Sequence, residues 1–340
     1  METDRMIGAF FFADRLHALD RNERTEALAR LVDFGVDTVM IESEEYRDDV
    51  IADAHDAGLR FWGGISCFLA PTDDVFEDSP VLRPVLSNGE PRPRMEWYNG
   101  LTPTIEAHRR DRIDEMSRIV ESHDLDGFAL DFVRWPLHWE VELRPGHPPP
   151  LDCSFDRTTL EMFRDEYDLD LPIDAPAEAS TWIMEKAGQE WISFKCDVIT
   201  SFVEAARQQI ALASQKPMPL GLCIVPRFPE WVGQRVEDLS GVADFLFPMS
   251  YHSVLYRTSS WVGRNVSGFV RSSDAPVVPI VQIDTDGEAI GADLGAPVPD
   301  DDFTQLVSDS MAAGAGGVIS FTGTELLRGG RGDALRRGLA

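Results

Sequence analysis

Lysine is scarce in this chain of 340 residues. Of 31 basic residues, only Lys186, Lys195 and Lys216 are lysine, and 59 acidic residues give a formal net charge of −28. Such a charge repels polyanions, so we expect neither nucleic acid nor an anionic membrane as a partner. Acid-rich, lysine-poor surfaces suit high salt, where carboxylates are screened and stay hydrated. The composition therefore indicates a halophilic or GC-rich source.

Long hydrophobic runs and cysteine pairs are also missing. Residues 1–14 contain an apolar stretch too short for a signal-peptide core or a membrane span, so we predict a first strand there. The four cysteines show no paired spacing, which fits reduced thiols rather than a disulfide framework or a zinc site. We therefore expect a cytoplasmic protein without metal or cofactor, folded as one domain over residues 1–340. The cysteines are Cys67, Cys153, Cys196 and Cys223.

No glycine-rich fingerprint follows the first apolar stretch, and no phosphate-binding loop occurs in the sequence, which disfavours a doubly wound nucleotide-binding sheet. Instead, short apolar stretches alternate with segments of helical periodicity, and Gly35 and Gly58 end the first two helices. This alternation predicts an α/β fold, a (β/α)8 TIM barrel, with the doubly wound sheet as the alternative. The expected strands are residues 7–12, 36–41, 59–68, 128–133, 220–225, 243–248, 277–283 and 316–321.

Two long insertions interrupt this alternation. The first covers residues 69–102, after the third strand, and the second follows Pro136, after the fourth strand. Loops of this length in a compact domain are usually functional. We therefore expect both insertions to contribute to a site.

The fourth strand carries one acid in an otherwise apolar run. Residues 128–133 read Phe-Ala-Leu-Asp-Phe-Val, and Pro136 prevents the ladder from continuing. Asp131 is therefore either a structural carboxylate paired with Arg134 or a catalytic group at the mouth of the barrel.

In a barrel, the residues that follow the strands share one rim, where barrel enzymes keep their sites. Several acids and several Trp and Tyr side chains on one rim suit a carbohydrate, because carboxylates serve protonation and attack while aromatic faces pack on sugar C–H bonds. For most of these rim residues taken singly, a structural role is the simpler interpretation, such as a helix cap for Glu42 or a first-turn acid of a helix for Glu325. The predicted substrate-binding residues are Trp97, Tyr98, Asn99, Arg134, Trp135, Tyr251, His252, Gln282 and Asp284.

Residues 126–136 (DGFALDFVRWP) resemble the strand-four motif DG-x-x-x-D-y-x-R-[YW]-P of glycosyl-hydrolase-like barrel families. Residues 154–156, the helix around Trp191 and residues 244–251 are similar to that group too. The resemblance covers about the third to the sixth strand and implies a glycoside hydrolase, distantly similar to the α-amylase clan. It places Asp131 at the position of the strand-four nucleophile or acid. The clan has an arginine two residues before its nucleophile, whereas Ala129 stands here, which argues against a plain α-glucan substrate.

A glycosidase needs a second carboxyl group across the scissile bond. Our first choice is Glu230, because it follows the fifth strand between Pro229 and Trp231, a stiff and partly apolar setting that would raise its pKa. Asp284 is second, and Glu42 or Glu140 is third.

Two alternatives to a glycosidase remain. One is a carbohydrate-binding barrel without catalysis. The other is a metal-dependent hydrolase or aldolase barrel, which would need His pairs at a strand end, whereas His252 stands alone.

Overall fold

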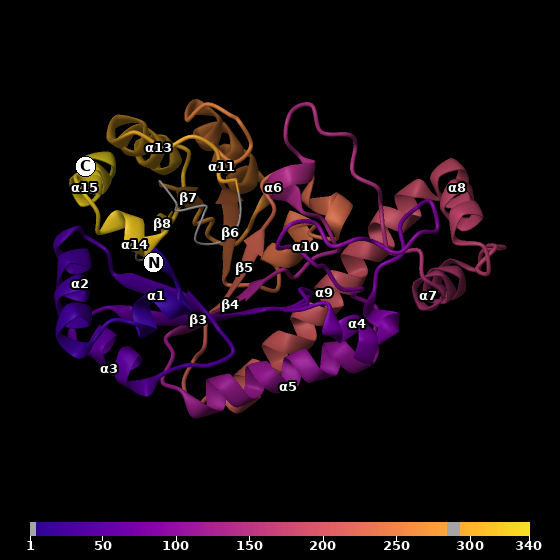
Figure 1. Ribbon diagram of the computed structural model, residues 1–340, viewed down its shortest axis with the longest axis horizontal. Helices are drawn as coiled ribbons and strands as arrows, with labels where there is room; N and C mark the ends of the chain where they lie inside the picture. Colours follow the sequence, from indigo (N-terminus) through magenta and orange to yellow (C-terminus); the bar gives the residue numbers. More distant parts are fainter. Residues whose placement is uncertain (1–4, 284–292) are drawn as a thin grey trace.

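Figure 1 shows the computed structural model, which describes residues 5–283 and 293–340. Eight parallel strands close into a barrel in chain order, and β1 pairs with β8. The predicted (β/α)8 barrel is confirmed, and the open doubly wound sheet is wrong. The strands are β1 (Met6–Phe12), β2 (Thr38–Glu42), β3 (Arg60–Ser66), β4 (Gly127–Asp131), β5 (Leu220–Ile224), β6 (Phe245–Ser250), β7 (Ile280–Gln282) and β8 (Gly317–Phe321).

Aromatic side chains fill the barrel interior near the amino ends of the strands. The ring of Trp62 on β3 contacts the ring of Phe247 on β6, with centroids 5.6 Å apart, so both rings lie inside the barrel. Gly127 and Gly221 leave room for them, because an added Cβ would lie 2.2 Å from the Trp62 ring and 2.0 Å from the Phe247 ring. This end of the barrel is packed. Space for a ligand is left at the carboxyl ends.

Helices surround the strands, and their ends follow local sequence signals. The helix α2 begins with a capping box between Asp20 and Glu23, and Gly35 follows its end with a φ of 87°. The helices are α1 (Ala13–His17), α2 (Arg21–Asp33), α3 (Asp48–Asp56), α4 (Asp74–Asp78), α5 (Glu106–Ser122), α6 (Trp139–Glu142), α7 (Arg157–Tyr167), α8 (Pro176–Lys186), α9 (Gly188–Ala213), α10 (Val236–Ser240), α11 (Ser260–Ser272), α13 (Asp300–Ala312), α14 (Gly323–Leu326) and α15 (Arg331–Leu339).

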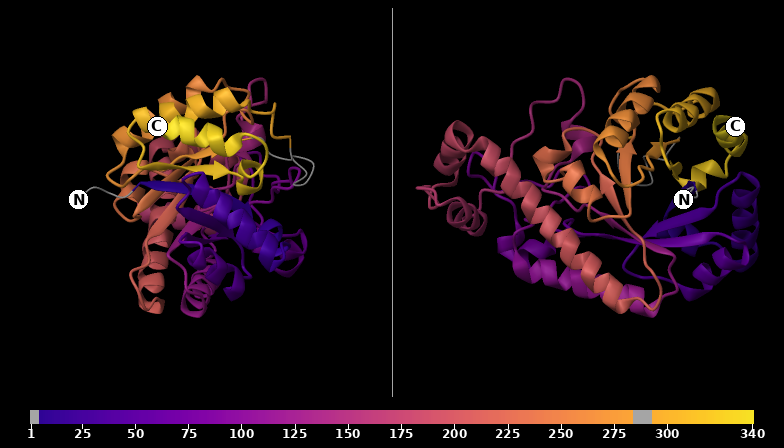
Figure 2. Two further views of the ribbon diagram at one scale, coloured as in Figure 1. Left: turned by 90° about the vertical axis from the view of Figure 1, so that its left-hand side faces the viewer. Right: turned by 180° about the vertical axis from the view of Figure 1, so that it is seen from behind.

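The two predicted insertions extend the barrel. The first, between β3 and α5, holds α4 and a short 3-10 turn at Pro80–Leu82. The second, between β4 and α9, holds α6, α7 and α8, and Figure 2 shows α7 and α8 at the end of the long α9 that lies far from β1 and β2. Within the described ranges, no helix has the length and apolar character needed to cross a membrane.

Candidate functional site

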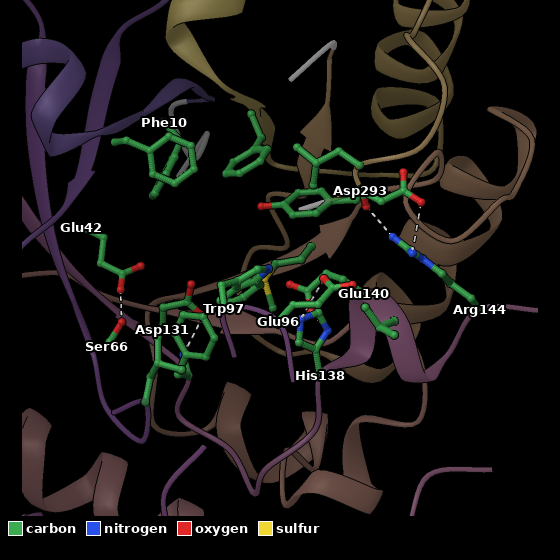
Figure 3. Close-up of a pocket in the computed structure, with 18 residues that line it drawn as sticks. Phe10, Glu42, Ser66, Glu96, Trp97, Asp131, His138, Glu140, Arg144 and Asp293 are labelled. Carbon is green, nitrogen blue, oxygen red and sulfur yellow. Dashed lines mark hydrogen bonds and ion pairs between the residues drawn. The ribbon is translucent and has the colours of Figure 1, made fainter. Parts of the chain in front are cut away.

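A cavity of about 320 Å³ opens at the carboxyl ends of the strands. Strand ends supply one part of its wall, and the two insertions and the segment after β7 supply the rest (Figure 3). Its lining residues are Phe10, Phe12, Glu42, Ser66, Leu69, Glu96, Trp97, Asp131, Phe132, His138, Glu140, Val141, Arg144, Met249, Tyr251, Asp293, Leu294 and Phe321.

Three neighbouring strands end in polar side chains at one end of this cavity. Glu42, Ser66 and Asp131 are the last residues of β2, β3 and β4, and Ser66 lies opposite Asp131 in the strand register. The Ser66 hydroxyl donates to Glu42, and the Phe132 backbone N–H donates to Asp131 at 2.6 Å. The carboxyl groups of Glu42 and Asp131 are within hydrogen-bonding reach of each other. The parallel register thus brings two carboxyls together from residues 89 positions apart in the sequence.

Burial controls the protonation of this pair. It raises the pKa of Glu42 to about 8, and the charge of Asp131 adds to that rise. Burial also raises the pKa of Asp131, although Arg134 and the Phe132 N–H act in the opposite direction. Two facing carboxyls in poorly hydrated surroundings cannot both ionise easily, so near neutral pH the pair holds one proton. Asp131 is the better placed of the two to carry the negative charge, because the cation and the N–H donor lie on its side.

Arg134 lies behind Asp131 and is only 1% exposed. Its Nη1 is 3.6 Å from Asp131 Oδ1, and its guanidinium stacks 4.6 Å from the centre of the Phe132 ring. None of its three side-chain nitrogens donates a hydrogen bond to any residue that the structure describes. It acts on the cavity as a buried positive charge rather than as one arm of a tight ion pair.

A third carboxyl comes from the second insertion. Glu140, in α6, lines the cavity with its side chain 13% exposed, and burial raises its pKa to about 7. His138 Nδ1 is 3.8 Å from Glu140 Oε2, and His138 Nε2 is 3.9 Å from Glu96 Oε2. Burial lowers the pKa of His138 to about 4, so the imidazole is neutral near pH 7. Neither ring nitrogen of His138 has a hydrogen-bond partner among the described residues.

Three of the predicted site residues meet in the cavity, namely Asp131, Trp97 and Tyr251. The first-choice partner acid, Glu230, is exposed on the 3-10 turn Pro229–Val232 and does not line the cavity. Of the lower-ranked acids, Glu42 and Glu140 do line the cavity, and Asp284 lies outside the described residues.

The other predicted substrate-binding residues are buried behind the cavity wall, where most have bonds of their own. The hydroxyl of Tyr98 accepts from the Leu137 N–H, and Asn99 donates to Asp73. The Trp135 indole donates to the Lys195 carbonyl. The remaining three, Arg134, His252 and Gln282, are buried as well and do not line the cavity, and Gln282 donates to the Leu294 carbonyl.

Sequence reasoning missed Ser66, His138 and Arg144. Ser66 stands near the end of an otherwise apolar strand, which was a usable signal. His138 and Arg144 lie in an irregular insertion with no periodicity, so no sequence pattern pointed to them. Among the residues that the structure describes, no group of three or more His, Cys, Asp or Glu side chains could hold a metal ion.

Comparison with family models gave no match, and neither did comparison with curated proteins. Among solved structures, the chain is similar to the glycoside hydrolase domain of PgaB (BpsB) from Bordetella bronchiseptica, with a TM-score of 0.72 and 13% identity over 98% of both chains. It is also similar to a β-galactosidase from the Antarctic haloarchaeon Halorubrum lacusprofundi, with a TM-score of 0.66 and 15% identity over 93% of this chain. The α-L-fucosidase isoenzyme 2 from Paenibacillus thiaminolyticus has a TM-score of 0.61 and 13% identity over 98% of this chain.

The chain spans 52% of the galactosidase and 48% of the fucosidase. At these identities the comparisons establish the fold, a barrel of the kind found in glycoside hydrolases.

Proposed function

We propose that this protein is a glycoside hydrolase acting on an oligosaccharide, a polysaccharide or a glycoconjugate. The observation that carries the proposal is the presence of Glu42, Asp131 and Glu140 in one cavity that Trp97 and Tyr251 also line. Buried carboxyls with displaced pKa values supply the acid and the base of glycoside hydrolysis, and aromatic faces hold sugar rings. The fold shared with barrels named as glycoside hydrolase, galactosidase and fucosidase supports the same reading.

Unsatisfied polar atoms support a hydroxyl-rich ligand. Fifteen buried side-chain nitrogen and oxygen atoms of the described residues have no hydrogen-bond partner, and eight of them belong to residues on or next to the cavity wall. Buried polar groups in folded proteins are nearly always hydrogen-bonded. A sugar in the cavity would supply partners for those on its wall, which belong to Trp97, His138 and Glu140. The eight atoms belong to Trp97, Arg134, His138, Trp139 and Glu140.

The three carboxyls take different roles in the proposed mechanism. Glu140 is the general acid that protonates the leaving oxygen, because a pKa of about 7 keeps much of it protonated near neutral pH. Asp131 is the ionised carboxylate that attacks the anomeric carbon or activates water. Glu42 holds the proton that it shares with Asp131 and so limits the negative charge at that end of the cavity. Glu140 thus replaces Glu230 as the proposed partner of Asp131.

The test is activity on a panel of oligosaccharides and aryl glycosides, with Asp131→Asn, Glu140→Gln and Glu230→Gln compared with the native protein. We expect Glu140→Gln to lower kcat/KM on oligosaccharides by about 10²–10⁴-fold, the usual contribution of a general acid. The loss should be much smaller on a dinitrophenyl glycoside, whose leaving group needs no proton. Asp131→Asn should lose activity on both substrates.

Glu230→Gln is the matched control, because it changes an exposed carboxyl and should leave turnover unchanged. An active Asp131→Asn variant would end the proposal for that residue. Activity lost in Glu230→Gln but kept in Glu140→Gln would return the partner role to Glu230. Sugar binding without turnover by the native protein would favour the carbohydrate-binding alternative.

A further inference from the structure

Strained backbone occurs in the segments that follow several of the strands. Among the residues that the structure describes, five other than glycine have a positive φ, and four of them lie in the segments that follow β3, β4, β5 and β6: Glu96, Phe132, Phe228 and Tyr256. Bulky side chains rarely adopt this conformation, and strained residues cluster at ligand sites. Tyr256 has a φ of 50° and is 55% exposed, so burial of its ring does not offset the strain.

The ring of Tyr256 is held in place by groups from two other segments. Its hydroxyl donates to Asp293 Oδ2 at 2.8 Å, and the Arg144 guanidinium carbon lies 5.1 Å from the ring centre. Arg144 is also held by groups other than this ring, because its Nε donates to the Val254 carbonyl at 3.0 Å and its Nη1 is 3.3 Å from Asp293 Oδ2. The guanidinium packs on the ring, and the residue remains 55% exposed.

Both groups that hold Tyr256 also line the cavity. Figure 3 shows Arg144 and Asp293 at the end opposite Glu42 and Asp131. Tyr256 therefore contacts two residues of the cavity wall without lining the cavity itself, at the end away from Glu42 and Asp131. The Asp293 side chain is 55% exposed, so its carboxylate can accept further hydrogen bonds beside the ring.

We infer that Tyr256 is the stacking platform of a second sugar subsite, which takes a unit of the same glycan that occupies the cavity. The open part of the ring packs against the C–H face of a pyranose, and the Asp293 carboxylate accepts from its hydroxyls. This inference rests on the proposed function and deepens it. The substrate class becomes a chain of at least two linked sugars rather than a single sugar on a small aglycone.

Phe228 provides a matched control. Its φ is 53°, it is 59% exposed, and the Arg227 guanidinium carbon lies 4.9 Å from its ring centre. Neither residue lines the cavity. Phe228→Asn therefore removes an equally exposed and equally strained aromatic side chain that the inference does not involve.

The experiment compares Tyr256→Asn, Tyr256→Phe and Phe228→Asn on two substrates that share one sugar. One is the glycosyl fluoride, whose leaving group fills no second subsite, and the other is the matching oligosaccharide of three to five units. Asparagine tolerates the left-handed conformation, so both Asn variants should melt no lower than the native protein. We expect Tyr256→Asn to lower kcat/KM about tenfold on the oligosaccharide and to leave the fluoride unchanged.

Tyr256→Phe keeps the ring, so its kcat/KM should stay within about threefold of the native value on both substrates. This change is smaller than the one expected when the stacked ring is removed. Phe228→Asn should match the native protein throughout. Equal losses on the two substrates in Tyr256→Asn would overturn the subsite, as would no loss on either or a loss of the same size in Phe228→Asn.

A separate binding measurement distinguishes failure of this inference from failure of the proposed function. If the native protein cleaves no glycoside, glycan-array binding and calorimetric titration of the bound oligosaccharides are compared across the same variants. Binding weakened in Tyr256→Asn alone would support the subsite in a protein that does not catalyse hydrolysis. Binding unchanged by Tyr256→Asn, or no bound glycan at all, would overturn it.

Discussion

Two of the deeply buried arginines in the described part of the protein, Arg24 and Arg134, are bonded in opposite ways. Arg24, in α2, is 2% exposed and donates to Asp53 through both Nε and Nη2, at 2.8 and 2.5 Å. Its Nη2 also reaches Asp49 at 2.9 Å, and its Nη1 reaches the Leu19 carbonyl at 3.3 Å. Arg134, at the barrel mouth, is 1% exposed and makes no hydrogen bond to any residue that the structure describes.

The comparison shows what a structural ion pair looks like in this fold. Charge-assisted hydrogen bonds with good geometry are the gain that offsets the desolvation of a buried charge. The Arg24 pair has that geometry, whereas Arg134 remains 3.6 Å from Asp131 with its donors unused. Unpaired donors on a buried arginine lower the stability of the fold, and destabilising arrangements of this kind are common at functional sites. The structural reading of Asp131 and Arg134 therefore has less support than the catalytic one.

The sharpest test is the same substitution at both arginines. Arg24→Met leaves the buried Asp53 without its main partner and should lower the free energy of unfolding by about 3–5 kcal/mol. Arg134→Met removes a buried charge that makes no hydrogen bond, so the melting temperature should stay equal or rise. Thermal and urea melts at pH 7 measure both. Equal losses in the two variants would show that Arg134 is a structural group like Arg24.

The buried carboxyl of Glu42 should make the stability of the protein depend on pH. Its pKa is about 8 in the folded protein and near 4.5 when exposed, so the folded state binds the proton more tightly. Its contribution to stability is complete below pH 4.5 and is lost as the pH rises through 8. Each unit of pKa difference corresponds to about 1.4 kcal/mol, so the free energy of unfolding of the native protein should fall by on the order of a few kcal/mol between these pH values. Glu42→Gln cannot ionise at this position and should not show that fall.

Urea melts of the native protein and Glu42→Gln at pH 5 and pH 8 test this prediction. Glu45→Gln, an exposed carboxyl on the loop that follows β2, serves as the control and should leave the pH dependence unchanged. Parallel pH profiles for the native protein and Glu42→Gln would contradict a proton held at Glu42.

Arg134 should also set the working pH of the proposed enzyme. Its charge lowers the pKa of both Asp131 and Glu140, so Arg134→Met should raise both values. Because Asp131 acts ionised and Glu140 acts protonated, both limbs of the bell-shaped kcat/KM profile should move upward by about one pH unit. Arg24→Met should leave the profile unmoved, and a shift of the same size there would refute a local effect of Arg134.

The smallest effect expected is that of salt. The net charge of −28 repels itself, and salt screens exposed charges. The melting temperature should rise by several degrees between low salt and 1 M KCl, although screening weakens the contact of Arg24 with the half-exposed Asp49. A flat or falling melting temperature would count against adaptation to high salt.

Much of the fold was predictable because strand and helix periodicities are local. All eight strands were predicted near their observed positions, and Gly35 and Gly58 marked the ends of α2 and α3. The end of β4 was placed two residues too late, because Phe132 turns to a φ of 48° directly after Asp131. The helix α8 was missed, since it lies in an insertion whose packing on α9 is tertiary.

The sequence by itself determined the number and order of the strands and placed Asp131 at the end of β4, because these follow from apolar periodicity and one acid in an apolar run. Only the tertiary structure decided which acids join Asp131. Glu42 is brought there by the parallel register and Glu140 by an irregular insertion, whereas Glu230 is exposed on a 3-10 turn and does not line the cavity. The pKa of each carboxyl depends on desolvation and on charges remote in sequence, and chain order specifies neither.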